Sequence, residues 1–127
     1  LIDQSNMAVE TLPVYKRKLL MMAGALATKP LILMMDEPVG GLNPQEIDDI
    51  MEIVRKVSEA GVTILLIEHV MRFLVALSDR VIIMHQGENI YDGLPKGLAS
   101  DSVVVDVYLG DGASELISDA LKETKHV

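Results

Sequence analysis

The sequence predicts an α/β fold in which a parallel sheet is flanked by helices. Two short aliphatic runs, residues 31–35 and 62–67, have the length and composition of buried strands. Residues 43–59 lie between them and have the periodicity of an amphipathic helix. A strand, a helix and a second strand in this order form the unit from which parallel sheets are built. Neither run alternates between apolar and polar residues, so we expect each strand to be buried on both faces.

A first helix is predicted over residues 12–28. Thr11 can cap it, and Pro13 is tolerated in the first turn because its missing N–H has no intrahelical partner there. The apolar residues of this segment repeat at the spacing of one helix face, namely Leu19, Met22, Ala23 and Leu26. We expect this face to be buried.

The helix between the two strands carries a clear start signal. Asn43 can cap it, Pro44 suits the first helical position, and Glu46 can return a hydrogen bond to the cap. Gly61 marks its end, so the helix is expected to run to about residue 59. The expected buried stripe consists of Ile47, Ile50, Met51, Val54 and Val57.

The remainder of the chain predicts smaller elements. A short helix at 71–77 and a strand at 80–84 precede a turn at Gln86 and Gly87, which resembles that of a hairpin. Pro95 begins another helical turn, and residues 101–109 supply a final apolar segment. The composition shifts after Gly110, so we expect residues 1–110 to form the domain and residues 111–127 a peripheral tail.

Composition excludes several classes of function. The absence of cysteine excludes disulfides, thiolate metal sites and cysteine nucleophiles, and agrees with a cytoplasmic location. A net charge of −8 argues against a nucleic-acid partner, because binding to phosphate backbones needs clustered Lys and Arg. The longest apolar stretch, residues 19–27, is about half of what a spanning helix needs, so we expect a soluble chain. The start at Leu1 and the lack of an export leader suggest a piece of a longer cytoplasmic protein.

Two adjacent acids, Asp36 and Glu37, follow the first predicted strand. Open α/β sheets bind ligands at the carboxyl ends of their strands. Asp36 is suited to Mg²⁺, and Glu37 is suited to accept a proton from a water that attacks a phosphoryl group. The same dipeptide also fits a strand that simply emerges into solvent, and the dipeptide alone leaves both interpretations open.

His69 follows the second predicted strand, directly after Glu68. Parallel strands joined by a helix end at the same sheet edge, so Glu37 and His69 are expected to converge although 32 positions separate them. A neutral imidazole there can donate a hydrogen bond to a γ-phosphate. His85 and His126 have no comparable setting and are expected to be structural or exposed.

Three motifs occur in order along the chain. Residues 31–38 (Leu-Ile-Leu-Met-Met-Asp-Glu-Pro), 41–44 (Gly-Leu-Asn-Pro) and 67–69 (Ile-Glu-His) resemble the Walker B motif, the D-loop and the switch-histidine loop of ABC ATPases. The runs 36–44 and 67–71 are similar to those of branched-chain amino acid importer ATPases. The dipeptide Gln86-Gly87 and the segment Val107-Tyr108-Leu109-Gly110 support the same resemblance.

This resemblance implies the C-terminal half of a P-loop NTPase-like domain that uses ATP and Mg²⁺. It assigns Asp36 to the metal, Glu37 and His69 to catalysis, and the D-loop residues Gly41, Leu42 and Asn43 to the interface with a second ABC ATPase subunit. The second subunit would be identical or different. Transmembrane permease subunits are the other implied partners, and they place the protein peripherally on the cytoplasmic face of the cell membrane.

Two features depart from the family pattern. The signature Leu-Ser-Gly-Gly-Gln is replaced, at the nucleotide-contacting segment, by Leu12, Pro13, Val14, Tyr15 and Lys16. Proline removes a backbone donor and the two larger side chains block close approach to a phosphate, although the lysine could supply a compensating charge. The phosphate-binding loop G-x-x-x-x-G-K-[ST] occurs nowhere, so these 127 residues alone are expected not to hydrolyse ATP appreciably.

Four interpretations remain open at this point. The first is the catalytic and dimerising half of an importer ATPase, and the second is a non-catalytic or regulatory subunit with a degenerate signature. The third is a soluble ABC-type ATPase that works on DNA or ribosomes. The last is a half-domain that misfolds or swaps strands through exposed sheet edges. The site hypothesis requires the two predicted strands to be parallel neighbours or near neighbours.

Overall fold

The structure is a computed structural model, and it describes residues 4–106, apart from the side chain of Ala99. The chain divides into two compact units, Leu1–Glu68 and His69–Val127. The predicted tail at 111–127, the segment 107–110 and His126 lie outside the described residues. Within residues 4–106, no helix has the length and apolar composition that crossing a membrane requires.

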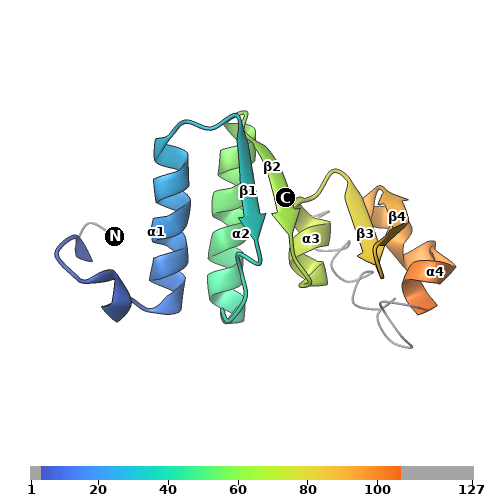
Figure 1. Cartoon of the computed structure of the whole chain (residues 1–127), viewed down its shortest axis with the longest axis horizontal. Helices are drawn as coiled ribbons and strands as arrows, with labels where there is room; N and C mark the ends of the chain where they lie inside the picture. Colours follow the sequence, from blue (N-terminus) through green and yellow to red (C-terminus); the bar gives the residue numbers. More distant parts are fainter. Residues whose placement is uncertain (1–3, 107–127) are drawn as a thin grey trace. The chain divides into compact units, whose positions relative to one another are not determined.

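The first unit is built around a strand, a helix and a strand, as predicted. It contains the 3₁₀ turn η2 (Val9–Thr11), α1 (Val14–Ala27), β1 (Ile32–Asp36), α2 (Pro44–Glu59) and β2 (Thr63–Ile67) (Figure 1). Strands β1 and β2 pair in parallel, with a register that runs from Ile32 opposite Thr63 to Asp36 opposite Ile67. The predicted α/β class with a parallel sheet and flanking helices is therefore confirmed.

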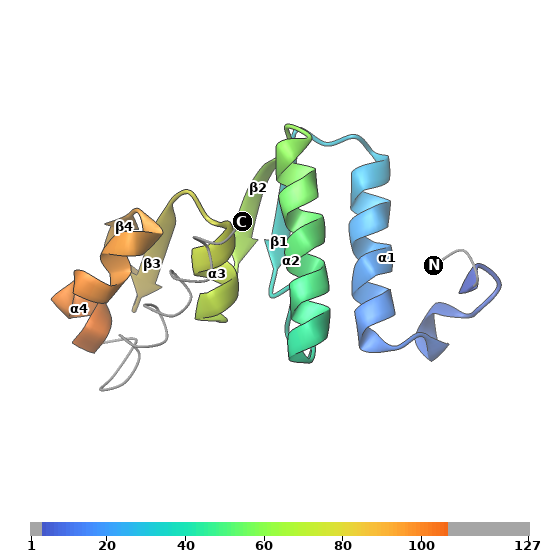
Figure 2. The same ribbon diagram turned by 180° about the vertical axis from the view of Figure 1, so that it is seen from behind.

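Only one face of the β1–β2 sheet is buried. Leu33 and Met35 of β1 are 5% and 7% exposed, whereas Ile32 and Met34 are 59% and 69% exposed. Figure 2 shows α2 in front of the sheet, and its residues Ile50, Met51 and Val54 are also buried. The prediction that both strands are buried on both faces is wrong for the described residues. An all-aliphatic run makes both faces apolar, but the run itself does not specify what covers each face.

The start of α1 differs from the prediction. Thr11 does not cap the helix, because its hydroxyl donates to the carbonyl of Ala8 and closes η2. The helix begins at Val14, and Pro13 precedes it instead of lying in its first turn. On the predicted buried face only Met22 is buried, while Leu19, Ala23 and Leu26 remain partly or fully exposed. The apolar spacing marks the helix correctly but overestimates how much of it is covered.

Helix α2 agrees with the prediction at both ends. The side chain of Asn43 accepts a hydrogen bond from Glu46 N at 3.0 Å, and the carboxylate of Glu46 accepts one from Asn43 N at 3.0 Å. This reciprocal pair is the capping box that the sequence predicts. Within the predicted stripe Ile50, Met51 and Val54 are buried, and the two outer members are half-buried.

The second unit contains the predicted short helix and hairpin. Its elements are α3 (Met71–Leu77), β3 (Val81–His85), β4 (Glu88–Gly93), the 3₁₀ helix η3 (Pro95–Ser100) and α4 (Ser102–Val104). Strands β3 and β4 are antiparallel, and the turn between them has positive φ at Gln86 (49°) and Gly87 (86°). Positive φ at both central residues matches the twist of a two-residue hairpin loop.

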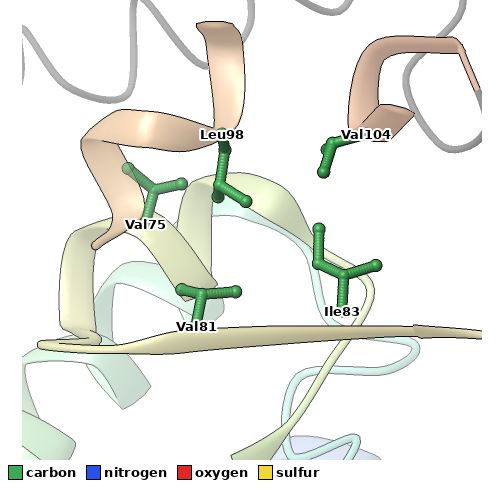
Figure 3. Close-up of a cluster of buried hydrophobic side chains, with 5 residues drawn as sticks. All are labelled: Val75, Val81, Ile83, Leu98 and Val104. Carbon is green, nitrogen blue, oxygen red and sulfur yellow. The ribbon is translucent and has the colours of Figure 1, made fainter. Parts of the chain in front are cut away.

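A small apolar cluster holds the second unit together. Its members come from one helix, one strand and the segment after the hairpin: Val75, Val81, Ile83, Leu98 and Val104 (Figure 3). At the open side of the hairpin, Arg80 donates two hydrogen bonds to Asp92, at 2.7 and 2.6 Å. The guanidinium of Arg80 lowers the pKa of Asp92 below its usual value.

The burial pattern of β1 can be tested with two neighbouring methionines. We expect Met35→Ala to lower the free energy of unfolding of this chain by about 2 to 5 kcal/mol, because a buried side chain is removed and a cavity remains. Met34→Ala should change it by less than about 0.5 kcal/mol, because its side chain is mostly exposed. Urea unfolding of both variants measures the difference. Equal losses would mean that the register of β1 is displaced by one residue.

Candidate functional site

The candidate site lies at the edge of the sheet where β1 and β2 both end. Asp36 is the last residue of β1 and pairs with Ile67, the last residue of β2. The pairing continues one residue further, because Glu37 N donates to the carbonyl of Ile67 at 2.9 Å. The predicted acids and the segment before His69 therefore leave the sheet side by side.

Glu37 has an unusual backbone conformation. Its φ is +45°, in the left-handed region that residues with a side chain seldom adopt. Such a conformation costs on the order of 1–3 kcal/mol and persists only where surrounding contacts enforce it. Here the Glu37 N–H is bound to β2, and its carbonyl accepts from Lys18 Nζ at 2.8 Å and from Gly40 N at 3.3 Å. The backbone of the proposed base is thus fixed on both sides.

The loop after Glu37 is held by Glu68, which the sequence analysis did not select. Val39 N donates to Glu68 Oε1 at 3.1 Å, and Val39 is only 2% exposed. This bond ties the loop after β1 to the residue that follows β2. The position of Glu68 at the end of a strand, directly before His69, was the only sign in the sequence that it could belong to the site. The sequence could not reveal its partner, because that partner is a backbone amide 29 residues away.

The predicted D-loop residues form a turn that leads into α2. Gly41 has a φ of +76°, which favours glycine, and Leu42 N donates to the carbonyl of Val39 at 3.2 Å. A Cβ at Gly40 would lie 3.9 Å from Glu37 Oε2, so the carboxylate rests against this glycine. Gly41 and Asn43 are exposed and Leu42 is half-exposed. These three residues are accessible to a second molecule.

Asp36 fits the metal role as a single ligand. It is exposed, and among residues 4–106 there is no group of three or more His, Cys, Asp or Glu side chains that could hold a metal ion. Mg²⁺ keeps several water ligands and is commonly bound by one or two carboxylates together with substrate phosphates. One carboxylate at a strand end is therefore compatible with Mg²⁺ bound together with a nucleotide.

His69 is exposed and opens the second unit, whereas Glu37 belongs to the first. The parallel register brings the strand ends together, but the convergence of the two side chains stays a prediction. His85 lies at the end of β3 and is exposed, as expected.

The segment at the signature position is tied to α2. The hydroxyl of Tyr15 donates to Asp49 Oδ2 at 3.2 Å, and Lys16 Nζ lies 5.4 Å from the centre of the Tyr15 ring. Burial and the hydrogen bond to Asp49 both raise the pKa of Tyr15. Leu12 is buried, while Pro13 and Val14 are exposed. Two of these side chains, those of Tyr15 and Lys16, thus interact within the chain.

Comparison with known sequences finds related ATP-binding proteins. No protein-family model matches the chain. The high-affinity branched-chain amino acid transport ATP-binding protein BraF of Pseudomonas aeruginosa is 38% identical over 112 residues, which are 87% of this chain and 44% of that protein. The corresponding protein LivG of Escherichia coli is 34% identical with the same coverage of each chain. The chain spans less than half the length of these curated relatives.

Comparison with solved structures gives the same result. MJ1267, an ATP-binding cassette of an ABC transporter, superposes with a TM-score of 0.77 and 31% identity over 87% of this chain and 45% of its own. A nucleotide-free ATP-binding cassette from an ABC transporter has a TM-score of 0.72 and 31% identity, over 80% and 42% of the two chains. Each match again covers less than half of the solved chain.

The contact between Glu68 and the Val39 amide can be measured directly. We expect Glu68→Ala to speed hydrogen exchange of the Val39 amide roughly fivefold, because a partly exposed charged acceptor contributes about 1 kcal/mol. Glu68→Gln keeps an oxygen acceptor and should have a smaller effect. Glu59→Ala, at an exposed position of α2, is the matched control. Unchanged exchange in Glu68→Ala would contradict the contact.

Proposed function

Because the chain belongs to the ABC transporter ATP-binding proteins, we propose that it is the C-terminal half of an ABC ATPase domain and takes part in ATP hydrolysis. The observation that carries this proposal is the fixed position of Glu37 at the carboxyl edge of the parallel sheet. Asp36 and Glu37 are both exposed there, and three hydrogen bonds hold the Glu37 backbone.

Each candidate residue has a distinct role in the proposal. Asp36 binds Mg²⁺, which when present neutralises negative charge on the nucleotide phosphates. Glu37 accepts the proton of the water that attacks the γ-phosphate, and His69 donates a hydrogen bond to that phosphate. Glu68 keeps the loop after Glu37 in place through Val39.

The phosphate-binding loop comes from outside these 127 residues in this proposal. Its lysine and backbone N–H groups hold the β- and γ-phosphates in P-loop NTPases, and the sequence contains no such loop. We therefore expect the chain alone to hydrolyse ATP no faster than background.

The proposed partners follow from the surface of the D-loop and from the relatives. Gly41, Leu42 and Asn43 contact a second ABC ATPase subunit, and their exposure supports this assignment. Transmembrane permease subunits complete the transporter, so the protein acts at the cytoplasmic face of the membrane. The proposed cargo is a branched-chain or related amino acid, because BraF and LivG are branched-chain amino acid transport proteins.

A second candidate function is a non-catalytic subunit that retains the fold for assembly or regulation. The hydrogen bond between Tyr15 and Asp49 favours it, because this tyrosine stands where the signature has a glycine. A tyrosine side chain at this position blocks the close approach of a phosphate to the backbone, which a glycine would allow. In that case the intact acids at the sheet edge would serve binding without turnover.

Replacement of the proposed base separates the two functions. In the full-length protein we expect Glu37→Gln to lower kcat for ATP hydrolysis at least about 100-fold with little change in nucleotide affinity, because a general base contributes about that factor. Glu59→Gln is the matched control, since it makes the same chemical change at an exposed position of α2. Equal kcat values for wild type and Glu37→Gln would end the catalytic proposal and favour the non-catalytic one.

Restoring the signature tests whether the altered segment limits the rate. The variant Pro13→Ser, Val14→Gly, Tyr15→Gly and Lys16→Gln should raise kcat at least about tenfold, because it returns the N–H that Pro13 lacks and lets a phosphate approach the backbone at the start of α1. Tyr15→Phe removes only the hydrogen bond to Asp49 and controls for its loss. An unchanged kcat in the restored variant would show that this segment does not set the rate.

A further inference from the structure

One hydrogen bond connects α1 directly to the backbone of the proposed base. Lys18 Nζ donates to the carbonyl oxygen of Glu37 at 2.8 Å, across 19 positions of sequence. The same oxygen also accepts a hydrogen bond from Gly40 N at 3.3 Å, in the loop that follows Glu37. The side chain of Lys18 thus connects α1 to the loop that begins at Glu37.

Lys18 lies on the same side of α1 as the altered signature segment. Tyr15 and Lys18 are three residues apart, so their side chains leave neighbouring positions of one helix face. Tyr15 contacts Asp49 of α2, and Lys18 contacts the loop that precedes α2. The first two turns of α1 are therefore held by two contacts. One is to α2, and the other is to the loop that precedes α2.

The conformation of Glu37 needs such a contact. Its positive φ is unfavourable for a residue with a side chain, and Pro38 restricts its backbone further because the ring crowds the preceding residue. The N–H of Glu37 is fixed by Ile67, and the carbonyl oxygen of the following peptide accepts a hydrogen bond of 3.3 Å from Gly40 N. The ammonium of Lys18 adds a shorter, charged hydrogen bond of 2.8 Å to that oxygen and so restrains the peptide from α1.

We propose that Lys18 is a positioning residue that links the segment 12–16 to the carboxylate of Glu37. This inference rests on the proposed function. It adds that segment 12–16 contacts the nucleotide held by the partner subunit, while Glu37 serves the nucleotide of its own subunit. A shift of α1 at the nucleotide of the partner subunit then changes the backbone conformation of Glu37 at the nucleotide of its own subunit. In this proposal Lys18 contacts neither the nucleotide nor the attacking water.

Steady-state kinetics of the full-length protein provide the first test. We expect Lys18→Met, which keeps the aliphatic stem and removes the ammonium, to lower kcat about tenfold, while KM for ATP changes less than about twofold. Lys18→Arg retains a charged donor and should keep more than about half of the wild-type kcat. Arg17→Met removes the neighbouring charge on an exposed face of α1 and should leave kcat unchanged.

The second test measures the Glu37 peptide without reference to turnover. The carbonyl ¹³C chemical shift of Glu37 should move in Lys18→Met, return towards the wild-type value in Lys18→Arg, and stay in place in Arg17→Met. Where Lys18→Met melts too low for assay, Lys18→Gln, which keeps an uncharged donor on a shorter chain, is measured in the same way and should show a displaced shift and reduced kcat.

The two tests separate failure of this inference from failure of the proposed function. If Glu37→Gln abolishes hydrolysis but Lys18→Met leaves both kcat and the Glu37 carbonyl shift at wild-type values, the positioning role is overturned. If Glu37→Gln leaves hydrolysis unchanged, the proposed function fails, and the role of Lys18 in catalysis fails with it. A general loss of stability would lower kcat for Lys18→Met and Lys18→Arg alike, which also contradicts the proposal.

Discussion

The parallel pairing of β1 with β2 is the constraint on which the rest of the first unit depends. It places Asp36 opposite Ile67 and allows Glu37 N to continue the ladder onto the Ile67 carbonyl. Both loops that carry polar residues therefore start from one sheet edge, and Glu68 can reach the amide of Val39. Without this register the two acids and the glutamate before His69 would share no common edge, and the loop at residues 37–42 would lose its contact with β2.

The features that sequence reasoning predicted correctly are those encoded by neighbouring residues. The capping box of Asn43 and Glu46 involves residues three positions apart, and the structure shows both of its hydrogen bonds. The two-residue turn at Gln86 and Gly87 is equally local. The parallel strand pair was also predictable, because a helix between two aliphatic runs leaves few topologies open. The edge position of Asp36 and Glu37 followed from that topology.

The features that sequence reasoning missed depend on contacts between distant residues. Thr11 has the chemistry of a helix cap, but its hydroxyl closes the preceding turn instead. The aliphatic run of β1 gave no indication of which face α2 covers, so Ile32 and Met34 were wrongly expected to be buried. Glu68 accepts a hydrogen bond from a backbone amide 29 positions away, and Lys18 donates one to a backbone carbonyl 19 positions away. No spacing between neighbouring residues predicts such a partner. Their roles emerge only when the loop after β1 is seen in three dimensions.

The left-handed turn at Glu37 explains how two consecutive acids can both be exposed at this edge. Successive residues of a strand point to opposite faces, so Asp36 lies on the open face with Met34, and a strand continued through Glu37 would direct its carboxylate to the buried face of Met35. Burying an unpaired carboxylate among apolar side chains is costly. The positive φ ends the strand before that happens, and both acids are exposed. The strain of this turn is therefore offset by keeping the second carboxylate out of the core, and the hydrogen bonds of the Glu37 backbone with Ile67, Gly40 and Lys18 stabilise the strained geometry.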